Sequence, residues 1–201
     1  MNIRDKVGKT LSEGWNDPAE IRKVINILPG HKYLNRREQI QRKILYIEKH
    51  LPELQEVSRK KGQESRKILD VSCGAGTLIE VFNALGHRAQ GTERPATPFK
   101  GFHRSQGIKV SYFDSACIPF PFKDASFDVV TCIGAINFYK PIPMWPYIVG
   151  DFFRLSREIV LVHANIDIVW NTNKGFLTRL SPPKGWELEV AIDGLFKWRK
   201  R

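Results

Sequence analysis

Three carboxylates stand at the ends of predicted strands, close to a turn made of small residues. Asp70 ends the apolar run KILD, Glu93 ends HRAQGTE and Asp114 ends IKVSYFD. The sequence SCGAG (residues 72–76, the glycine turn) follows Asp70 almost at once and leads into a helical pattern. Glycines in such a turn let the backbone approach a ligand at the N-terminus of a helix. Because ligands bind at the carboxyl ends of parallel strands, we expect the three acids to line one pocket.

The residues around the glycine turn distinguish between the ligands that such a pocket could hold. A dinucleotide fingerprint needs a third glycine where Ile79 stands, and a P-loop needs a Gly-Lys-Ser/Thr sequence that the turn lacks. Carboxylates repel phosphate groups, whereas they suit an ammonium group and a ribose diol. S-adenosylmethionine carries both of these groups and no phosphate, so the residues favour it as the cofactor.

Short apolar runs alternate with helical patterns from residue 67 onward, which is typical of a parallel sheet covered on both faces. Helices are predicted at 77–86 and 144–156, with a weaker helix or loop at 98–107. The segments 185–192 and 195–200 are predicted to form a C-terminal β-hairpin. The fold class is therefore α/β and Rossmann-like, with a mostly parallel central sheet whose strands are expected at 67–71, 87–93, 108–114, 126–134 and 157–165.

The N-terminal third of the chain has a different pattern. Apolar residues recur there at three- and four-residue spacing with basic residues between them, which predicts an amphipathic helix with the stripe Ile40, Ile44, Ile47, Leu51 and Leu54. The net charge of the chain is +11, and residues 1–67 contribute +7 of it from 16 Lys and Arg against 9 Asp and Glu. We expect a basic helical cap region at 1–66 and a cofactor-binding domain at 67–201.

The stretch from about Ile68 to Ala164 resembles the class I S-adenosylmethionine-dependent methyltransferases, in particular the type 11 methyltransferase-domain group. The family's Asp/Glu-x-Gly-x-Gly-x-Gly loop matches residues 70–76, with Ser72 in place of the first glycine. The resemblance implies that Glu93 grips the ribose hydroxyls, and that Asp114 lies beside the adenine amino group with Ser115 against the ring. The predicted cofactor-binding set, with no metal, is Asp70, Ser72, Cys73, Gly74, Gly76, Glu93, Arg94, Asp114, Ser115 and, as an apolar wall, Ile133.

Methyl transfer from a sulfonium is an in-line displacement, so the protein must chiefly align the acceptor and exclude water. A hydroxyl acceptor would also need a base. His163, at the end of the fifth predicted strand, is the first candidate, followed by His31 and Tyr33, although a lone histidine is more often structural. Asn137 and Tyr139 are expected to shape the acceptor cavity. They belong to a run, GAINF and its neighbours, that replaces the acid and histidine pair often found there in the family.

Three functions remain open at this point. The first is methyl transfer to an O or N atom of a small molecule or of a cell-surface sugar or lipid precursor. Aromatic residues beyond the cofactor blocks favour an acceptor of that kind: Trp145, Trp170, Trp186 and Trp198. The second is an RNA methyltransferase that docks through the basic N-terminal helix, and the third is a cofactor-binding protein of the same fold without turnover.

Composition argues against several other classes of protein. The first ten residues carry four charges, unlike a secretory signal, and no apolar run approaches the roughly 20 residues of a membrane span. Cys73, Cys117 and Cys132 are scattered, with no CxxC pair, which argues against a disulfide framework and a zinc site. We therefore expect a cytoplasmic protein without a membrane span.

Overall fold

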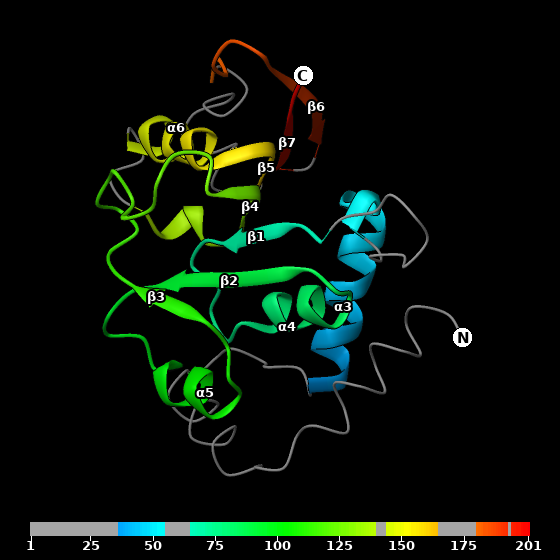
Figure 1. Ribbon diagram of the computed structural model, residues 1–201, viewed down its shortest axis with the longest axis vertical. Coiled ribbons are helices and arrows are strands. Elements are labelled where there is room, and N and C mark those ends of the chain that lie inside the picture. Colours follow the sequence, from blue (N-terminus) through cyan, green and yellow to red (C-terminus); the bar gives the residue numbers. More distant parts are fainter. Residues whose placement is uncertain (1–35, 55–64, 140–143, 165–179, 193) are drawn as a thin grey trace.

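A seven-stranded sheet forms the centre of the computed structural model, which describes residues 36–54, 65–139, 144–164, 180–192 and 194–201. The strand order is β3-β2-β1-β4-β5-β7-β6, and the first five strands of that order run parallel (Figure 1). β7 pairs antiparallel with β5 and with β6. The predicted fold class and the C-terminal hairpin are confirmed by these strands: β1 (Lys67–Asp70), β2 (Arg88–Glu93), β3 (Val110–Tyr112), β4 (Phe127–Ile133), β5 (Ser156–His163), β6 (Trp186–Ile192) and β7 (Leu195–Lys200).

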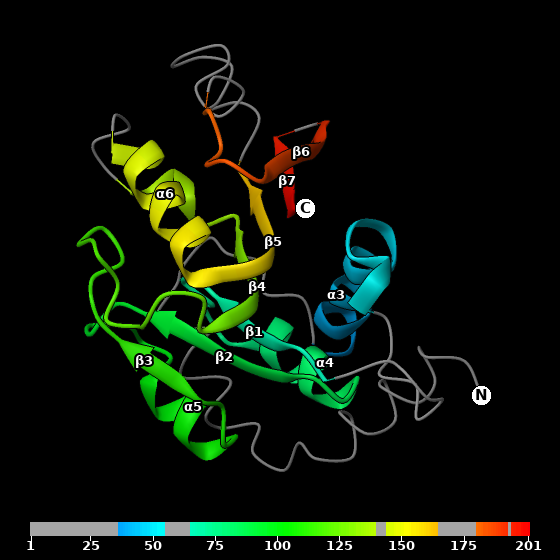
Figure 2. The same ribbon diagram turned by 45° about the horizontal axis from the view of Figure 1, so that its top comes forward.

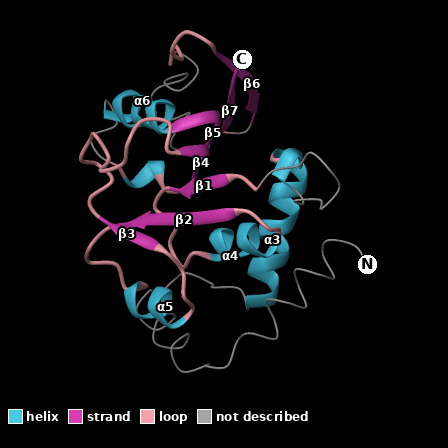
Figure 3. Ribbon diagram, in the orientation of Figure 1, coloured by secondary structure: helices cyan, strands magenta, loops and turns pink. Residues whose placement is uncertain are grey.

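Helices cover both faces of the sheet (Figures 2 and 3). On one face lie α3 (Arg36–His50), α4 (Thr77–Ala84) and α5 (Lys100–Ser105), whose apolar side chains share one buried cluster. On the other face lies α6 (Trp145–Leu155), which shares a second cluster with the loop after β3. Two short 3₁₀ turns, η1 (Pro52–Leu54) and η2 (Ile136–Phe138), follow α3 and β4.

Side chains of the central strands alternate between these two clusters. Ile68 and Val129 belong to the cluster under α3 and α4, whereas their neighbours Leu69 and Val130 belong to the cluster under α6. Successive side chains of a strand point to opposite faces, so a strand covered on both sides must be apolar at every position. This is why the predicted strands read as continuous apolar runs.

The amphipathic helix predicted before the sheet is confirmed as α3, but it ends at His50, so Leu51 and Leu54 of the predicted stripe follow the helix. Its apolar stripe is buried, with Ile40, Ile44 and Ile47 only 2%, 3% and 1% exposed. These side chains share a cluster with Leu78 and Phe82 of α4, so α3 packs on the outside of the first helix of the sheet domain. The boundary predicted between residues 66 and 67 therefore separates α3 from a domain with which it shares one buried core.

The edge of the sheet at β3 is shorter than the sequence predicted. The predicted strand 108–114 is reduced to three residues, and β3 pairs only with β2. Gly107, with a φ of 64°, turns the chain after α5, and the backbone nitrogen of Ile108 donates to the carbonyl oxygen of His103. At the other end Asp114 begins a turn in which its carbonyl oxygen accepts from the nitrogen of Cys117. The outermost predicted residues, Ile108 and Asp114, therefore bond locally, whereas Lys109 and Phe113 still form main-chain hydrogen bonds to β2.

A network of charges ties the C-terminal hairpin to the segment after α3. The Nζ atom of Lys197 lies 2.8 Å from Glu53 and 3.4 Å from Glu189, and Arg199 also contacts both carboxylates. Lys197 is buried, so its charge needs these partners. The network joins η1 to β6 and β7 and fixes the far edge of the sheet.

Among the described residues, none of the helices has the length and apolar character needed to cross a membrane.

Candidate active site

The first carboxylate, Asp70, is buried at the carboxyl end of β1. Only 4% of the residue is exposed, and the hydroxyl of Thr131 on β4 donates to its Oδ1 over 2.8 Å. Burial raises the pKa of Asp70 from 3.8 to about 6, while Lys43 on α3 and the Thr131 hydrogen bond act in the opposite direction. A cationic ligand at this position would favour the ionised carboxylate.

The glycine turn is held against β2 by main-chain contacts. The backbone nitrogen of Cys73 donates to the carbonyl oxygen of Thr92 over 3.0 Å. Gly74 and Gly76 have φ angles of 56° and 79°, which favour glycine. Gly91 on β2 was missed by the sequence analysis, although a glycine inside a strand is itself a sign of close approach. A Cβ atom at Gly91 would lie 2.5 Å from the sulfur of Cys73, so no other residue fits without displacing the turn.

Glu93, at the end of β2, reaches back to the same turn. Its Oε2 accepts from the backbone nitrogen of Gly74 over 2.9 Å, and its Oε1 accepts from the nitrogen of Arg94 over 3.0 Å. These bonds orient the carboxylate beside the turn and leave lone pairs on both oxygens for a diol. The side chain of Arg94 itself is exposed.

His103 of α5 supports the turn from the other side and was not among the predicted residues. Its Nε2 lies 2.7 Å from the carbonyl oxygen of Gly74, and its Nδ1 lies 3.0 Å from the hydroxyl of Tyr112. Because a carbonyl can only accept, Nε2 must carry the proton and Nδ1 must accept from Tyr112. Burial lowers the pKa of His103, which agrees with the neutral ring that this arrangement needs.

Four hydroxyl groups lie behind the glycine turn. Ser72 takes the place of the family's first glycine, with a φ of 54°, and its hydroxyl contacts Tyr139, with Ser115 at 3.5 Å. Ser115 is buried and lies 3.4 Å from the hydroxyl of Thr92. Asp114 is exposed, and its Oδ1 accepts from the backbone nitrogen of Ala116 over 2.9 Å. Tyr139, expected to shape an acceptor cavity, thus holds the turn.

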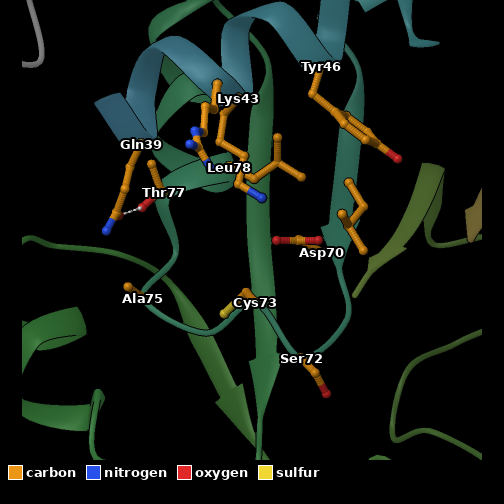
Figure 4. A pocket seen from close by; sticks show the side chains of 11 residues that line it. Gln39, Lys43, Tyr46, Asp70, Ser72, Cys73, Ala75, Thr77 and Leu78 are labelled. Atoms are coloured by element: carbon orange, nitrogen blue, oxygen red, sulfur yellow. Dashed lines mark hydrogen bonds between the residues drawn. The ribbon is translucent and has the colours of Figure 1, made fainter. Parts of the chain in front are cut away.

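A cavity of about 330 Å³ opens between the glycine turn and α3. Figure 4 shows three α3 side chains, Gln39, Lys43 and Tyr46, reaching over the turn, with Asp70 below them. Of the predicted cofactor-binding residues, four line this cavity: Asp70, Ser72, Cys73 and Ile133. The remaining ones, Gly74, Gly76, Glu93, Arg94, Asp114 and Ser115, belong to the turn or lie toward β2 and β3.

The contribution of α3 could have been found in the sequence. Gln39, Lys43 and Tyr46 recur at spacings of four and three residues, directly beside the apolar stripe. Such residues share a helix face. The basic residues between the apolar positions of this helix also reach the site, because the exposed Arg42 and the half-buried Lys43 both line the cavity.

Residues 69–158 match the family described as a methyltransferase domain. A Pyrococcus horikoshii protein of known structure superposes with a TM-score of 0.56 at 15% identity, covering 88% of this chain and 97% of its own. A Methanococcus maripaludis protein gives a TM-score of 0.51 at 10% identity, with coverages of 87% and 97%. No curated protein matches the chain significantly.

A third solved structure is a SAM-dependent methyltransferase from Archaeoglobus fulgidus. It superposes with a TM-score of 0.50 at 15% identity and covers 63% of this chain, which in turn spans 53% of the Archaeoglobus chain. Residues 69–158 of the chain therefore form a methyltransferase domain, and the solved structures share its fold. The methyltransferase domain predicted from the sequence is confirmed over these residues.

The methyltransferase domain continues beyond the matched residues at the end of β5. His163 lies there, paired in register with Ile133 of β4. Its Nδ1 is 3.1 Å from the hydroxyl of Tyr46, and the two rings stack with centroids 5.7 Å apart. His163 therefore reaches the cavity through Tyr46. The other two candidate bases, His31 and Tyr33, lie outside the described residues.

The residues around the cavity fit S-adenosylmethionine. A buried carboxylate with a raised pKa faces a cavity that Lys43 and Arg42 also line, so both signs of charge are available for a zwitterionic amino-acid group. Glu93 offers a carboxylate on the far side of the same turn.

Proposed function

We propose that the protein transfers a methyl group from S-adenosylmethionine to an O or N atom of a small molecule or of a sugar or lipid precursor. The observation that carries this proposal is the pair of carboxylates of Asp70 and Glu93 on two sides of the glycine turn, next to a cavity closed by α3. Phosphate-bearing cofactors would be repelled by this pair.

The proposed site residues divide the cofactor into two halves. Glu93 would hold the ribose diol, Arg94 would flank it, and Asp114 and Ser115 would lie along the adenine. Asp70 would receive the ammonium group, with Lys43 and Arg42 on the carboxylate of the same amino-acid moiety, because each charge then meets its opposite. Cys73, Gly74 and Gly76 would supply the bend, and Ser72 would brace it from behind. Ile133 would form the apolar wall beside the sulfonium.

The reaction requires few dedicated catalytic residues of the protein. The bound cofactor supplies an activated methyl group, and the protein must hold an acceptor lone pair in line with the breaking bond and keep water away. Ile133, which lines the cavity, and the buried aromatic cluster under α6 would keep water from the strand ends. His163 is proposed as the group that finally receives the proton of the acceptor, through its contact with the hydroxyl of Tyr46.

One feature beyond the cavity offers a contact to a bound acceptor. The Oδ1 atom of Asn137, in the turn after β4, is buried and has no hydrogen-bond partner among the described residues. A buried acceptor atom without a partner is costly, and a donor on a bound molecule would satisfy it. Asn137 is therefore proposed to help position the methyl acceptor.

Calorimetry tests the cofactor assignment. Wild type should bind S-adenosylmethionine and S-adenosylhomocysteine, whereas Glu93→Gln, which keeps an oxygen for Gly74, should bind both at least about tenfold more weakly through loss of charged hydrogen bonds. Glu187→Ala on β6, which removes an exposed ion pair with Arg201, is the matched control and should leave both affinities unchanged. Equal affinity in wild type and Glu93→Gln would refute the ribose assignment, and no binding in wild type would refute the proposal.

Two further measurements separate the alternative functions. Affinity for RNA that falls steeply with ionic strength would favour the RNA methyltransferase, because phosphate contacts release counterions. Tight cofactor binding with no labelled product from a small-molecule extract and methyl-labelled S-adenosylmethionine would favour a protein without turnover. The proposal expects labelled small molecules and no salt-dependent RNA affinity.

A further inference from the structure

Two residues 117 positions apart meet at one end of the cavity. Tyr46 comes from α3 and His163 from the end of β5, and both lie outside the matched residues 69–158. The Tyr46 hydroxyl is 3.1 Å from Nδ1 of His163, and the rings stack at an interplanar angle of 22°. Tyr46 also lines the cavity beside Asp70 and Ile133. The pair therefore has one member in contact with the cavity and one behind it.

The sheet order places this pair at the end where an acceptor must enter. Glu93, Asp70, Ile133 and His163 end the strands β2, β1, β4 and β5, which are adjacent in that order. If Glu93 holds the ribose, as proposed above, the sulfonium lies toward β1 and β4. The methyl group must then be approached from the side of β4 and β5, where Tyr46 and His163 stand.

We propose that Tyr46 takes the proton of a hydroxyl acceptor while it passes its own proton to Nδ1 of His163. This step rests on the proposed methyl transfer. The acceptor oxygen forms the new bond to the methyl carbon, and the bond from that carbon to sulfur breaks with its electron pair going to sulfur. The acceptor proton moves to the Tyr46 oxygen, the Tyr46 proton moves to Nδ1 of His163, and the imidazolium then loses one proton to water. His163 is partly exposed, so water can receive that proton.

The surroundings of Tyr46 favour a relay over a preformed tyrosinate. Burial raises the pKa of Tyr46, and the nearby groups Asp70 and Cys132 raise it further. On α3 itself, the ring next to Tyr46 is that of His50, and the two ring centroids lie 4.7 Å apart. The Tyr46 hydroxyl therefore keeps its proton until the proton of the methyl acceptor reaches its oxygen. In the relay, Nδ1 of His163 then accepts the proton that Tyr46 gives up.

This arrangement selects the chemical class of the acceptor. A hydroxyl is a weak nucleophile while it keeps its proton, so a base that removes the proton during transfer accelerates its methylation. A neutral amine attacks with its own lone pair and loses a proton only afterwards. A tyrosine and histidine pair facing the acceptor is therefore suited to O-methylation of an alcohol or phenol.

The test compares Tyr46→Phe with Tyr147→Phe, an exposed tyrosine of α6 that serves as the control. Methyl-labelled S-adenosylmethionine is offered with catechol and benzyl alcohol, and with aniline and benzylamine as matched amines. Label should enter the hydroxyl compounds in preference to the amines. Tyr46→Phe should lower kcat by a factor of about 100 or more, with unchanged cofactor affinity by calorimetry, and Tyr147→Phe should resemble wild type. Preferential labelling of the amines, or an undiminished kcat in Tyr46→Phe, would overturn the inference.

A second measurement needs no acceptor. In the complex with S-adenosylhomocysteine, ¹⁵N spectra of His163 should show an Nδ1 without a proton that accepts a hydrogen bond, and this signal should change in Tyr46→Phe but not in Tyr147→Phe. A proton on Nδ1 of wild type would overturn the relay even if none of the four compounds is labelled. Failure of wild type to bind the cofactor would instead contradict the proposed function, so the two failures are distinct.

Discussion

The two ends of the cavity are built in different ways. The cofactor end consists of β1, the glycine turn and β2, a stretch of 27 residues from Lys67 to Glu93 joined by main-chain bonds such as Cys73 to Thr92. The acceptor end joins side chains from α3, η2 and β5, which are far apart in the sequence. Backbone geometry fixes the first end and tertiary packing the second. Substitutions that alter the backbone at the first end should therefore affect binding and folding together, whereas a substitution at Tyr46 of the second end should affect turnover alone.

Among the substitutions proposed for the cofactor end, Gly91→Ala should cause the largest loss of stability and of cofactor binding. The added methyl group meets the sulfur of Cys73 and the side chain of Ile79, and overpacking of this kind costs about 1–3 kcal/mol of unfolding free energy. Denaturant unfolding should show that loss, and calorimetry should show little or no cofactor binding. Gly150→Ala in α6, where a Cβ meets no atom within 4 Å, is the control and should be neutral or stabilising. Wild-type binding by Gly91→Ala would contradict the close approach.

Asp70→Asn should separate binding from stability at the same end. In wild type the folded pKa of about 6 lies above the ordinary 3.8, so the folded protein without ligand loses stability as the pH rises through that window. Cofactor affinity should rise over the same window as the carboxylate ionises. The variant is neutral at every pH and can still accept from Thr131. It should be at least as stable as wild type at neutral pH and bind about tenfold or more weakly, with no pH dependence near 6.

Calorimetry and thermal unfolding across this pH range check that prediction. Asp124→Asn, which removes an exposed partner of Arg154, is the control and should leave the pH dependence of binding intact. If cofactor affinity in Asp70→Asn still rises through pH 6, another group is responsible and the ammonium does not bind at Asp70.

Tyr139→Phe should have the smallest effect, because it removes a single hydroxyl behind the turn. The lost contact with Ser72 should cost about 0.5–1.5 kcal/mol, seen as a cofactor affinity weakened about two- to tenfold. Ser72→Gly restores the family's glycine and relieves the positive φ at that position. A double-mutant cycle should therefore show coupling between the two residues. Additive effects of the two substitutions would mean that the contact does not brace the turn.

The difference between the cofactor end and the acceptor end also explains which features could be predicted from the sequence. The strand, turn and acid of the cofactor end lie together in the chain, so hydrophobic period, glycine spacing and charge were enough to predict that Asp70, Gly76 and Glu93 lie around one turn. The stripe that buries α3 was also predicted. The direction of Lys43 and Tyr46 was not, because it depends on how α3 lies across α4, which no local pattern contains. The contact between Ser72 and Tyr139 needed the fold for the same reason.

A crystal structure of the protein with S-adenosylhomocysteine tests the central claim most directly. The account predicts the ribose on Glu93, the amino-acid group between Asp70 and Lys43, and the sulfur facing Ile133 with Tyr46 beyond it. A cavity that stays empty, or one filled by side chains of α3 in place of the nucleoside, would contradict it.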